Sequence, residues 1–350
     1  MMEKLVGAFF AGLFSLCMAN VPAAAQQPSI PAQAWQAYKA KFLDPGGRII
    51  DDANGNISHS EGQGYGLLLS VLADSAPDFT LIWSFTRTEL LLRSDGLAAW
   101  KWAPGTKPHV TDINNATDGD ILIAYALGLA GQQWNRPDYT AAGAAIARAI
   151  LAKTVISNAG RTLLMPAASG FSAAERQDGP VINPSYWIFE AFPVLDKLAP
   201  SPVWAKLHDD GLTILKDLRF GPRQLPSDWV SLKSSPQPAV GFPDEFGYNA
   251  LRIPLYLMRD GNTDRPLLTR LTQGMTGENG SISTIDLKSG TAKDSLSDPG
   301  YRIVNHLLAC VLDKTALPVD VKQFVPTQYY PSTLHLLGLS FAAAKQPECL

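Results

Sequence analysis

The stretch Ser58-His59-Ser60-Glu61-Gly62-Gln63-Gly64-Tyr65-Gly66, followed by the mostly apolar run Leu67–Leu72, places one carboxylate among three alternating glycines. Glycine has no side chain and lets bulky groups approach the backbone, and Ser58 or Ser60 can cap the helix that the apolar run predicts. We therefore expect Glu61 near a helix start, facing a cleared space. A plainer interpretation is that Glu61 only complements the helix macrodipole, as acids in first turns often do.

A second stretch, Asn114-Asn115-Ala116-Thr117-Asp118-Gly119-Asp120, also precedes an apolar run. Its two acids and two asparagines supply more hydrogen-bonding groups than a helix cap needs. Thr117 as the N-cap, with Asp118 and Asp120 as first-turn acids, would account for the same pattern. Because Glu61 and Asp118 each precede a glycine-containing apolar helix, we expect both carboxylates to face one cleft.

Apolar residues at helical spacing recur along the rest of the chain. They predict helices around Trp35, Tyr38 and Phe42 and over residues 81–92, 118–129, 139–152, 185–198, 203–218, 250–258, 301–312 and 332–344. Only residues 281–287, before the turn Lys288-Ser289-Gly290, have a strand pattern, and they predict a small β-hairpin. Since no low-complexity linker interrupts the series, we expect one all-α domain over residues 26–350.

The N-terminus has the pattern of a cleaved secretory signal peptide. Lys4 is basic, residues 5–21 are mostly apolar, and Ala23-Ala24-Ala25 supplies the small residues that signal peptidase requires. We therefore expect cleavage after Ala25 and a periplasmic or secreted protein. No later run is long enough to predict stable membrane insertion.

Histidines and cysteines do not form a metal-binding pattern. The histidines His59, His109, His208, His306 and His335 form no H-E-x-x-H or Cys/His cluster. Cys310 and Cys349 remain after cleavage of the signal peptide and could pair in an oxidising compartment, but their unrelated contexts do not predict that disulfide.

The charge balance and the missing motifs exclude several other functions. The formal net charge is -3, without the basic excess that nucleic acids or anionic membranes attract, so neutral partners fit better. The sequence has no G-x-S-x-G elbow and no P-loop, and its glycine-rich stretch is not a dinucleotide-binding motif.

Two carboxylates in one cleft are the minimum for glycoside hydrolysis, in which one acid protonates the leaving oxygen and another group activates water. Sugar sites also need flat aromatic surfaces against which the rings stack. The candidates for such surfaces are Trp100-Lys101-Trp102, Tyr186-Trp187, Trp229, Tyr248 and Tyr329-Tyr330. Each could instead belong to a hydrophobic core, where large aromatics are common.

Four segments carry a resemblance to a known family. Residues 60–66, 116–134, 246–254 and 298–301 resemble the signature of glycoside hydrolase family 8, and the likeness runs from about residue 31 to residue 344. Within that family the chain is similar to periplasmic endoglucanases found alongside bacterial cellulose synthases. The resemblance implies an (α/α)6 barrel of six inner and six outer helices that cleaves internal β-1,4-glucosidic bonds with inversion and without a metal or other cofactor. The implied partners are a β-1,4-glucan chain and a cellulose synthase complex.

The resemblance also assigns roles to single residues. Glu61 matches the general acid, and its glycine-rich, apolar surroundings predict a protonated carboxyl. Asp118 matches the acid that holds and distorts the sugar at the cleavage point. The resemblance implies that Arg252 in the cleft, Trp100 upstream, and Tyr329 and Tyr330 near the cleavage site bind substrate. Tyr186, from the aromatic candidates, and Asn249 complete the expected substrate-binding residues.

One position departs from the family pattern. Many members place an aspartate general base where this chain has Asn249, and an amide can orient water but cannot take its proton near neutral pH. Asp244 and Glu245 in the preceding loop are the nearest candidate bases, and Asp118 stays open for the role. Two functions therefore follow: an active inverting endoglucanase, or a catalytically weak or inactive glucan-binding accessory protein of polysaccharide export.

Overall fold

The computed structural model describes residue 1, residues 28–277 and residues 281–350. Apart from Met1, the predicted signal peptide lies outside the described residues. No helix in the described part is both long and apolar enough to cross a membrane.

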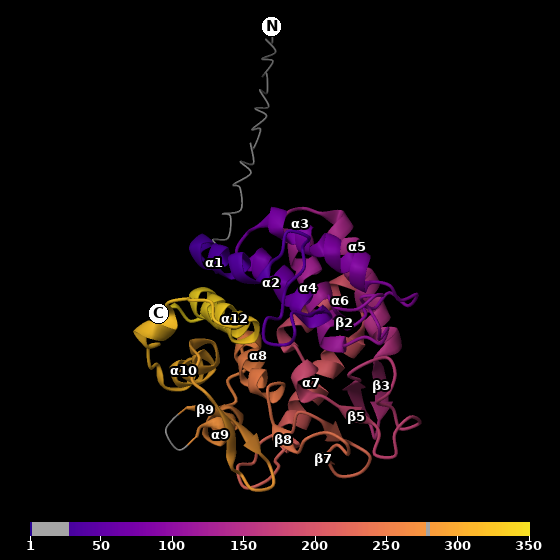
Figure 1. The fold of residues 1–350 in the computed structure, drawn as a ribbon. Helices are drawn as coiled ribbons and strands as arrows, with labels where there is room; N and C mark the ends of the chain where they lie inside the picture. Colours follow the sequence, from indigo (N-terminus) through magenta and orange to yellow (C-terminus); the bar gives the residue numbers. More distant parts are fainter. Residues whose placement is uncertain (2–27, 278–280) are drawn as a thin grey trace.

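Helices dominate the described part of the chain. The twelve α-helices are α1 Ala32–Phe42, α2 Ser60–Leu72, α3 Ala76–Phe85, α4 Thr117–Gln133, α5 Pro137–Lys153, α6 Phe192–Leu198, α7 Pro202–Asp217, α8 Ile253–Asp260, α9 Arg265–Met275, α10 Pro299–Asp313, α11 Val319–Lys322 and α12 Tyr329–Lys345. Their order runs round the molecule, so that the first helices, α1 and α2, lie next to the last one, α12 (Figure 1).

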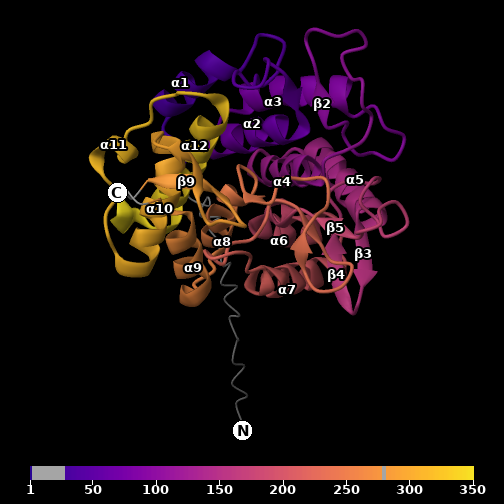
Figure 2. The ribbon, with the colours of Figure 1, turned by 60° about the horizontal axis from the view of Figure 1, so that its bottom comes forward.

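The even-numbered helices form an inner ring, and the odd-numbered helices cover it (Figure 2). Helix α2 packs on α4, α4 on α6, α8 on α10, α10 on α12, and α12 returns to α2; a 3-10 turn, Phe189–Ala191, connects α6 with α8. Outside the ring, α3 packs on α2, α5 on α4 and α6, α7 on α6, α9 and α11 on α10, and α1 on α12. The predicted (α/α)6 barrel is confirmed.

Glycines allow the inner helices α2 and α4 to touch. A Cβ atom on Gly64 would lie 2.5 Å from the Cβ of Leu122, and one on Gly119 would lie 2.1 Å from the Ser60 hydroxyl oxygen. Since real Cβ atoms do not approach other atoms this closely, both positions need glycine. At Gly64, the group that approaches the backbone is the neighbouring helix α4, and this close packing brings Glu61 close to α4.

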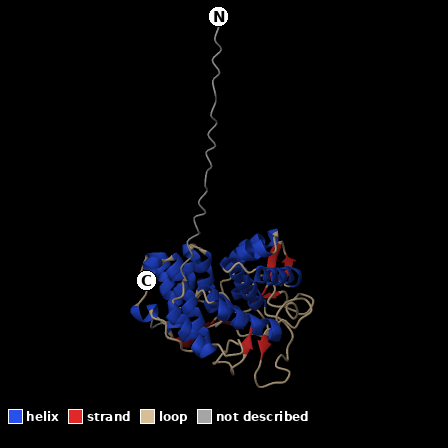
Figure 3. Ribbon diagram, turned by 90° about the horizontal axis from the view of Figure 1, so that it is seen from above, coloured by secondary structure: helices blue, strands red, loops and turns tan. Residues whose placement is uncertain are grey.

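The strands are short and lie among the loops (Figure 3). They are β1 Ser58–His59 paired with β2 Lys101–Trp102, β3 Val155–Asn158 paired with β4 Arg161–Leu164, the sheet of β5 Val181–Ile182, β6 Val230–Ser231 and β7 Gln237–Pro238, and the sheet of β8 Glu245–Phe246, β9 Ile282–Asp286 and β10 Ala292–Leu296. The predicted hairpin is confirmed as β9 and β10, and β8 adds a third strand to it.

Three predicted helices differ from the observed ones. Residues 185–198 form two 3-10 turns before the short α6, and Pro184 and Pro193 occupy the first turns of the separate pieces. Residues 250–252 form a 3-10 turn ahead of α8, and residues 86–90 form a π-helical turn after α3. Helix α9, which the sequence analysis did not predict, is strongly amphipathic.

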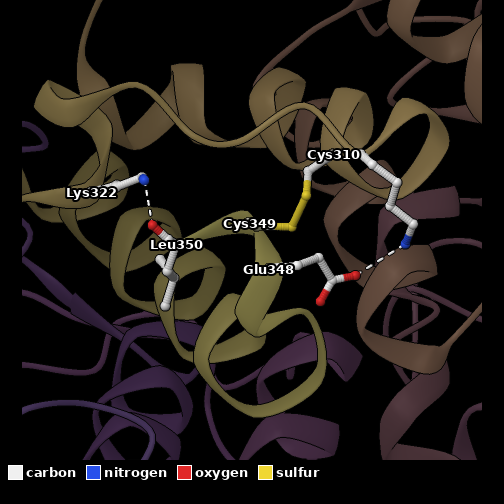
Figure 4. The surroundings of a disulfide bond; sticks show 6 residues. Cys310, Lys322, Glu348, Cys349 and Leu350 are labelled. Atoms are coloured by element: carbon white, nitrogen blue, oxygen red, sulfur yellow. Dashed lines mark hydrogen bonds and ion pairs between the residues drawn. A yellow bond between two sulfur atoms is a disulfide. The ribbon is translucent and has the colours of Figure 1, made fainter.

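A disulfide joins Cys310 at the end of α10 to Cys349 near the C-terminus, with Cα atoms 5.8 Å apart (Figure 4). The sequence contexts did not predict this pairing. Both cysteines are fully buried, and Lys314 forms an ion pair of 3.0 Å with Glu348 beside them. The bond fixes the C-terminal segment to the barrel.

Candidate active site

Glu61 lies in the first turn of α2, and His59 caps that helix. The His59 Nδ1 atom accepts a hydrogen bond of 2.9 Å from the Gly62 N–H, and its Nε2 atom lies 3.3 Å from a carboxylate oxygen of Asp51. The prediction of a serine cap is therefore wrong. The Ser58 hydroxyl donates to the Ile49 carbonyl, because the paired strand β1 turns it away from the helix start.

Asp118 and Asp120 lie in the first turn of α4 but have different partners. The Asp120 carboxylate accepts hydrogen bonds from the Ala98 N–H at 2.8 Å and the Asn115 side-chain amide at 2.9 Å. It thereby fixes the segment that leads to Trp100. Asp118 is instead directed at a buried arginine and is 1% exposed.

That arginine is Arg252, which connects the two predicted catalytic carboxylates. It donates from Nη1 to Glu61 Oε2 and from Nη2 to Asp118 Oδ2, each at 2.6 Å. The guanidinium is 1% exposed, and its Nε has no hydrogen-bond partner among the described residues. Residues separated by 134 and 191 positions in the chain thus meet at one buried charge. That both carboxylates face a substrate cleft stays a prediction.

The charge state of this pair differs from the prediction. Burial alone raises the pKa of Glu61, but the positive charge of Arg252 and the His59 ring outweigh it and lower that pKa. The prediction that Glu61 is protonated is therefore wrong for the free protein. The sequence could not indicate this, because no local pattern around Glu61 points to the arginine. Burial, opposed by Arg252 and reinforced by the Glu61 charge, raises the pKa of Asp118 to about 7.

Three tyrosines lie around this centre. The Arg252 guanidinium carbon lies 5.7 Å from the Tyr186 ring centroid. Tyr329 is 1% exposed, and its hydroxyl, which has no partner in the described part of the chain, lies 3.2 Å from where a Cβ on Gly62 would be. The half-buried Tyr330 donates to the Tyr248 carbonyl at 2.7 Å. Their role in binding an incoming sugar stays a prediction.

Trp100 lies beside the start of α2. Its carbonyl accepts a hydrogen bond of 3.0 Å from the Ser60 N–H, and its partly exposed indole donates to Asp112 at 2.8 Å. This position is compatible with a sugar platform next to Glu61. Of the other tryptophans proposed from the sequence, only Trp187 is buried. Trp102 and Trp229 are half-buried; Trp102 stacks on His109, and Trp229 stacks on Phe171 and on Phe242.

Asn249 occupies the end of a loop just before the 3-10 turn Ala250–Arg252, and its own carbonyl accepts from the Arg252 N–H at 3.4 Å. Its side-chain amide and its backbone N–H each donate to Asp228 Oδ2 at 3.3 Å. The sequence patterns do not indicate Asp228. This aspartate has no local motif, and only the fold brings it to Asn249.

Comparisons with known proteins agree with this geometry. Residues 2–344 of the chain match the protein family described as "Glycosyl hydrolases family 8". A probable endoglucanase of Novacetimonas hansenii is 36% identical over 315 residues, which cover 89% of this chain and 90% of that relative. The chain belongs to glycoside hydrolase family 8.

Other relatives match over different lengths. The endoglucanase of Cellulomonas uda is 42% identical over 226 residues, which are 64% of this chain and 62% of that protein, less than two thirds of its length. The structure of the endo-beta-1,4-glucanase CMCax from Acetobacter xylinum superposes with a TM-score of 0.81 at 33% identity, covering 92% of this chain and 100% of that one. Endoglucanase Cel10 from Klebsiella pneumoniae gives 0.79 at 34% identity, covering 90% and 99%.

Both carboxylates proposed as bases are paired with lysines of the hairpin; Asp244 lies in the loop as predicted, whereas Glu245 begins strand β8. Asp244 forms an ion pair of 2.8 Å with Lys288, and Glu245 forms one with Lys293. The other Glu245 oxygen lies 3.0 Å from where a Cβ on Gly247 would be. Glu245 is thus directed toward the loop that carries Asn249, whereas Asp244 is held at the turn of the hairpin.

Nothing in the described residues forms a group of three or more histidine, cysteine, aspartate or glutamate side chains that could hold a metal ion.

Proposed function

We propose that this family 8 chain is a secreted endo-β-1,4-glucanase that cleaves cellulose-type polysaccharide with inversion at the anomeric carbon. The observation that carries the proposal is the buried guanidinium of Arg252 between Glu61 and Asp118. An isolated buried salt bridge gives little stability in return for its desolvation cost, so a buried triad at a barrel end is better explained by catalysis.

The acid step uses one proton that Glu61 and Asp118 share. Asp118, with its pKa of about 7, holds that proton in the free protein and lies close enough to Glu61 to hydrogen-bond to it. Glu61 then donates the proton to the leaving oxygen as the bond from that oxygen to the anomeric carbon breaks.

Asp118 does not serve as the base in this proposal. An inverting pair needs carboxyls roughly 6.5–9.5 Å apart, so that a water fits between them and the sugar. Asp118 and Glu61 instead bind adjacent nitrogens of one guanidinium and interact with each other. The base must therefore come from another part of the cleft.

Asn249 holds the attacking water, and Glu245 accepts its proton. Glu245 is favoured over Asp244 because its carboxylate points toward the loop of Asn249, and the Glu245 carbonyl binds the Asp228 N–H at 3.0 Å. The proton therefore moves from water to Glu245 while the water oxygen bonds to the anomeric carbon.

The buried disulfide and the predicted signal peptide support a periplasmic or secreted location, since disulfides persist in oxidising compartments. The resemblance of the sequence to periplasmic endoglucanases found alongside bacterial cellulose synthases supports a role beside such a complex. The second candidate function is a glucan-binding accessory protein without significant hydrolysis, and the amide at Asn249 is the observation that favours it.

The release of reducing ends from carboxymethylcellulose tests the main proposal, and proton NMR of freshly released sugars tests inversion. We expect Glu245→Gln to lower turnover by about 10²–10⁴-fold and Asp244→Asn to change it by less than about 3-fold. An inert wild type that still binds cello-oligosaccharides would establish the accessory function instead. Equal losses in both variants would remove Glu245 as the base.

A further inference from the structure

Asp228 is a buried carboxylate whose hydrogen bonds all go to the loop that precedes Arg252. Its Oδ1 accepts from the Gly247 N–H at 2.9 Å and the Ala250 N–H at 2.8 Å. Its Oδ2 accepts from the backbone and the side chain of Asn249. The residue is 5% exposed.

These four bonds prevent Asp228 from acting as the base itself. A carboxylate offers about four lone-pair positions, and protein N–H groups use all four here. Gly247 makes this arrangement possible, because a Cβ at that position would lie 2.5 Å from Asp228 Oδ2. Asp228 therefore acts on the reaction, if at all, through the residues that it holds.

The important consequence concerns the amide of Asn249. An ionised carboxylate can only accept hydrogen bonds, so the amide must turn its NH2 group to Asp228 and its Oδ1 away from it. In the described part of the chain, that Oδ1 has no protein partner. The half-buried Asn249 amide thus keeps one hydrogen-bond acceptor, its Oδ1, whose direction is fixed by the bond from its NH2 group to Asp228.

We propose that Asp228 is a positioning residue that sets the orientation of Asn249, so that the amide oxygen receives a hydrogen bond from the attacking water. The inference rests on the proposed hydrolase function. In this arrangement the water donates one hydrogen to Asn249 and the other to the base, which leaves an oxygen lone pair directed at the anomeric carbon. An aspartate base both positions the attacking water and accepts its proton. Here the pair of Asp228 and Asn249 performs only the positioning.

A purely structural role is the alternative, since Asp228 also fixes the backbone of the loop through Gly247 and Ala250. Burial raises the pKa of Asp228, while the N–H donors oppose that change. Measurements of stability alone would not separate the two roles, so the tests use turnover and pH dependence.

The first test is Asp228→Asn, with Gly247→Ala as a second variant that displaces the same carboxylate. We expect each to lower kcat on cellohexaose by about 10–10²-fold, because a misplaced reactant commonly has an effect of this size. The KM should change by less than about 3-fold, since the sugar-binding tyrosines are untouched. Asp264→Asn is the matched control, because Asp264 caps α9 with a bond of 3.0 Å to the Leu267 N–H outside the active site. A loss of melting temperature in Asp228→Asn with unchanged kcat at 25 °C would overturn the proposal.

The second test exchanges the pair. In Asn249→Asp, the new carboxylate lies beside Asp228, and like charges raise the pKa of one of them. In the double variant Asp228→Asn with Asn249→Asp, the new amide donates to the new carboxylate and lowers its pKa. The acidic limb of kcat/KM should therefore lie at least about one pH unit lower in the double variant. Coincident acidic limbs would show that Asp228 does not act on position 249.

Failure of the main proposal would look different. If the wild type is inert and Asn249→Asp switches on hydrolysis, the active-enzyme function fails. The comparison of the single and double variants that carry aspartate at position 249 would still show whether Asp228 controls this position.

Discussion

The shared proton of Glu61 and Asp118 predicts how activity depends on pH. The free protein should lose kcat/KM on cellohexaose as the pH rises above about 7, the pKa of Asp118, because the pair then gives up the proton that Glu61 must donate. Above that value a single deprotonation lowers the rate about tenfold for each pH unit. The assay is a pH profile of kcat/KM at constant ionic strength.

Replacing Asp118 with asparagine tests the physical cause. The substitution removes the carboxyl that holds the shared proton, so that Glu61 must hold it alone against the positive charge of Arg252, whose Nη1 lies 2.6 Å from Glu61 Oε2. The charged form of Glu61 gains stability, its pKa falls further, and the alkaline limb should move to lower pH by about one unit or more. Glu61→Gln is the control, with turnover reduced by about 10²-fold or more and no such limb.

The same protonation affects folding. The folded state raises the pKa of Asp118 from 3.8 to about 7, so the folded protein binds this proton more tightly than the unfolded chain does. The stabilising contribution of this proton is complete below the unfolded pKa and is lost as the pH rises through about 7.

Two kinetic results would refute the shared-proton reasoning: an alkaline limb of kcat/KM that stays at the same pH in Asp118→Asn, or a wild-type rate that stays flat to about pH 9.

Three further outcomes concern binding and stability. Trp100→Ala should weaken the affinity for long cello-oligosaccharides in calorimetry more than it lowers the melting temperature; the reverse order would make Trp100 a packing residue. Replacing Cys310 and Cys349 with alanine should lower the melting temperature, because the bond spans 39 positions and its loss is worth roughly 4 kcal/mol in loop-closure entropy; an unchanged melting temperature would show that the C-terminal segment is held without it. Asp120→Ala leaves two buried N–H donors without partners at about 1–3 kcal/mol each, so thermal unfolding should shift while kcat at 25 °C stays within about 3-fold; a larger loss of kcat would give Asp120 a part in the chemistry.

Local patterns predicted the parts of the site that lie in helix starts. Glu61 and Asp118 were recognisable because each carboxylate precedes an apolar run, and such runs become inner helices that pack on almost every side. The ring of helices and the hairpin after residue 280 followed from periodicity and from the family resemblance. Irregular segments were harder to predict, because prolines divided one predicted helix into 3-10 turns and a short helix.

The properties that the sequence could not reveal depend on contacts between distant residues. The charge state of Glu61 is set by Arg252, 191 positions away, which reverses the effect that its apolar neighbours alone would have. Asp228 stands 21 positions before Asn249, in a loop without a motif. The cap at His59 depends on strand β1, which turns the Ser58 hydroxyl to Ile49.

The segment from Gly247 to Arg252 joins the two halves of the proposed reaction. Asn249 lies on the side of the water, and Arg252, one 3-10 turn later, binds both carboxylates on the side of the acid. Asp228 fixes the first end of this turn through the Ala250 N–H, and the buried guanidinium fixes the other end. In the proposed reaction, the separation between water and acid is therefore set by one backbone turn rather than by the loops that bind the polymer. Because of this division, substitutions in the turn should change kcat for substrates of every length, whereas substitutions at Trp100 should act mainly on the binding of long chains.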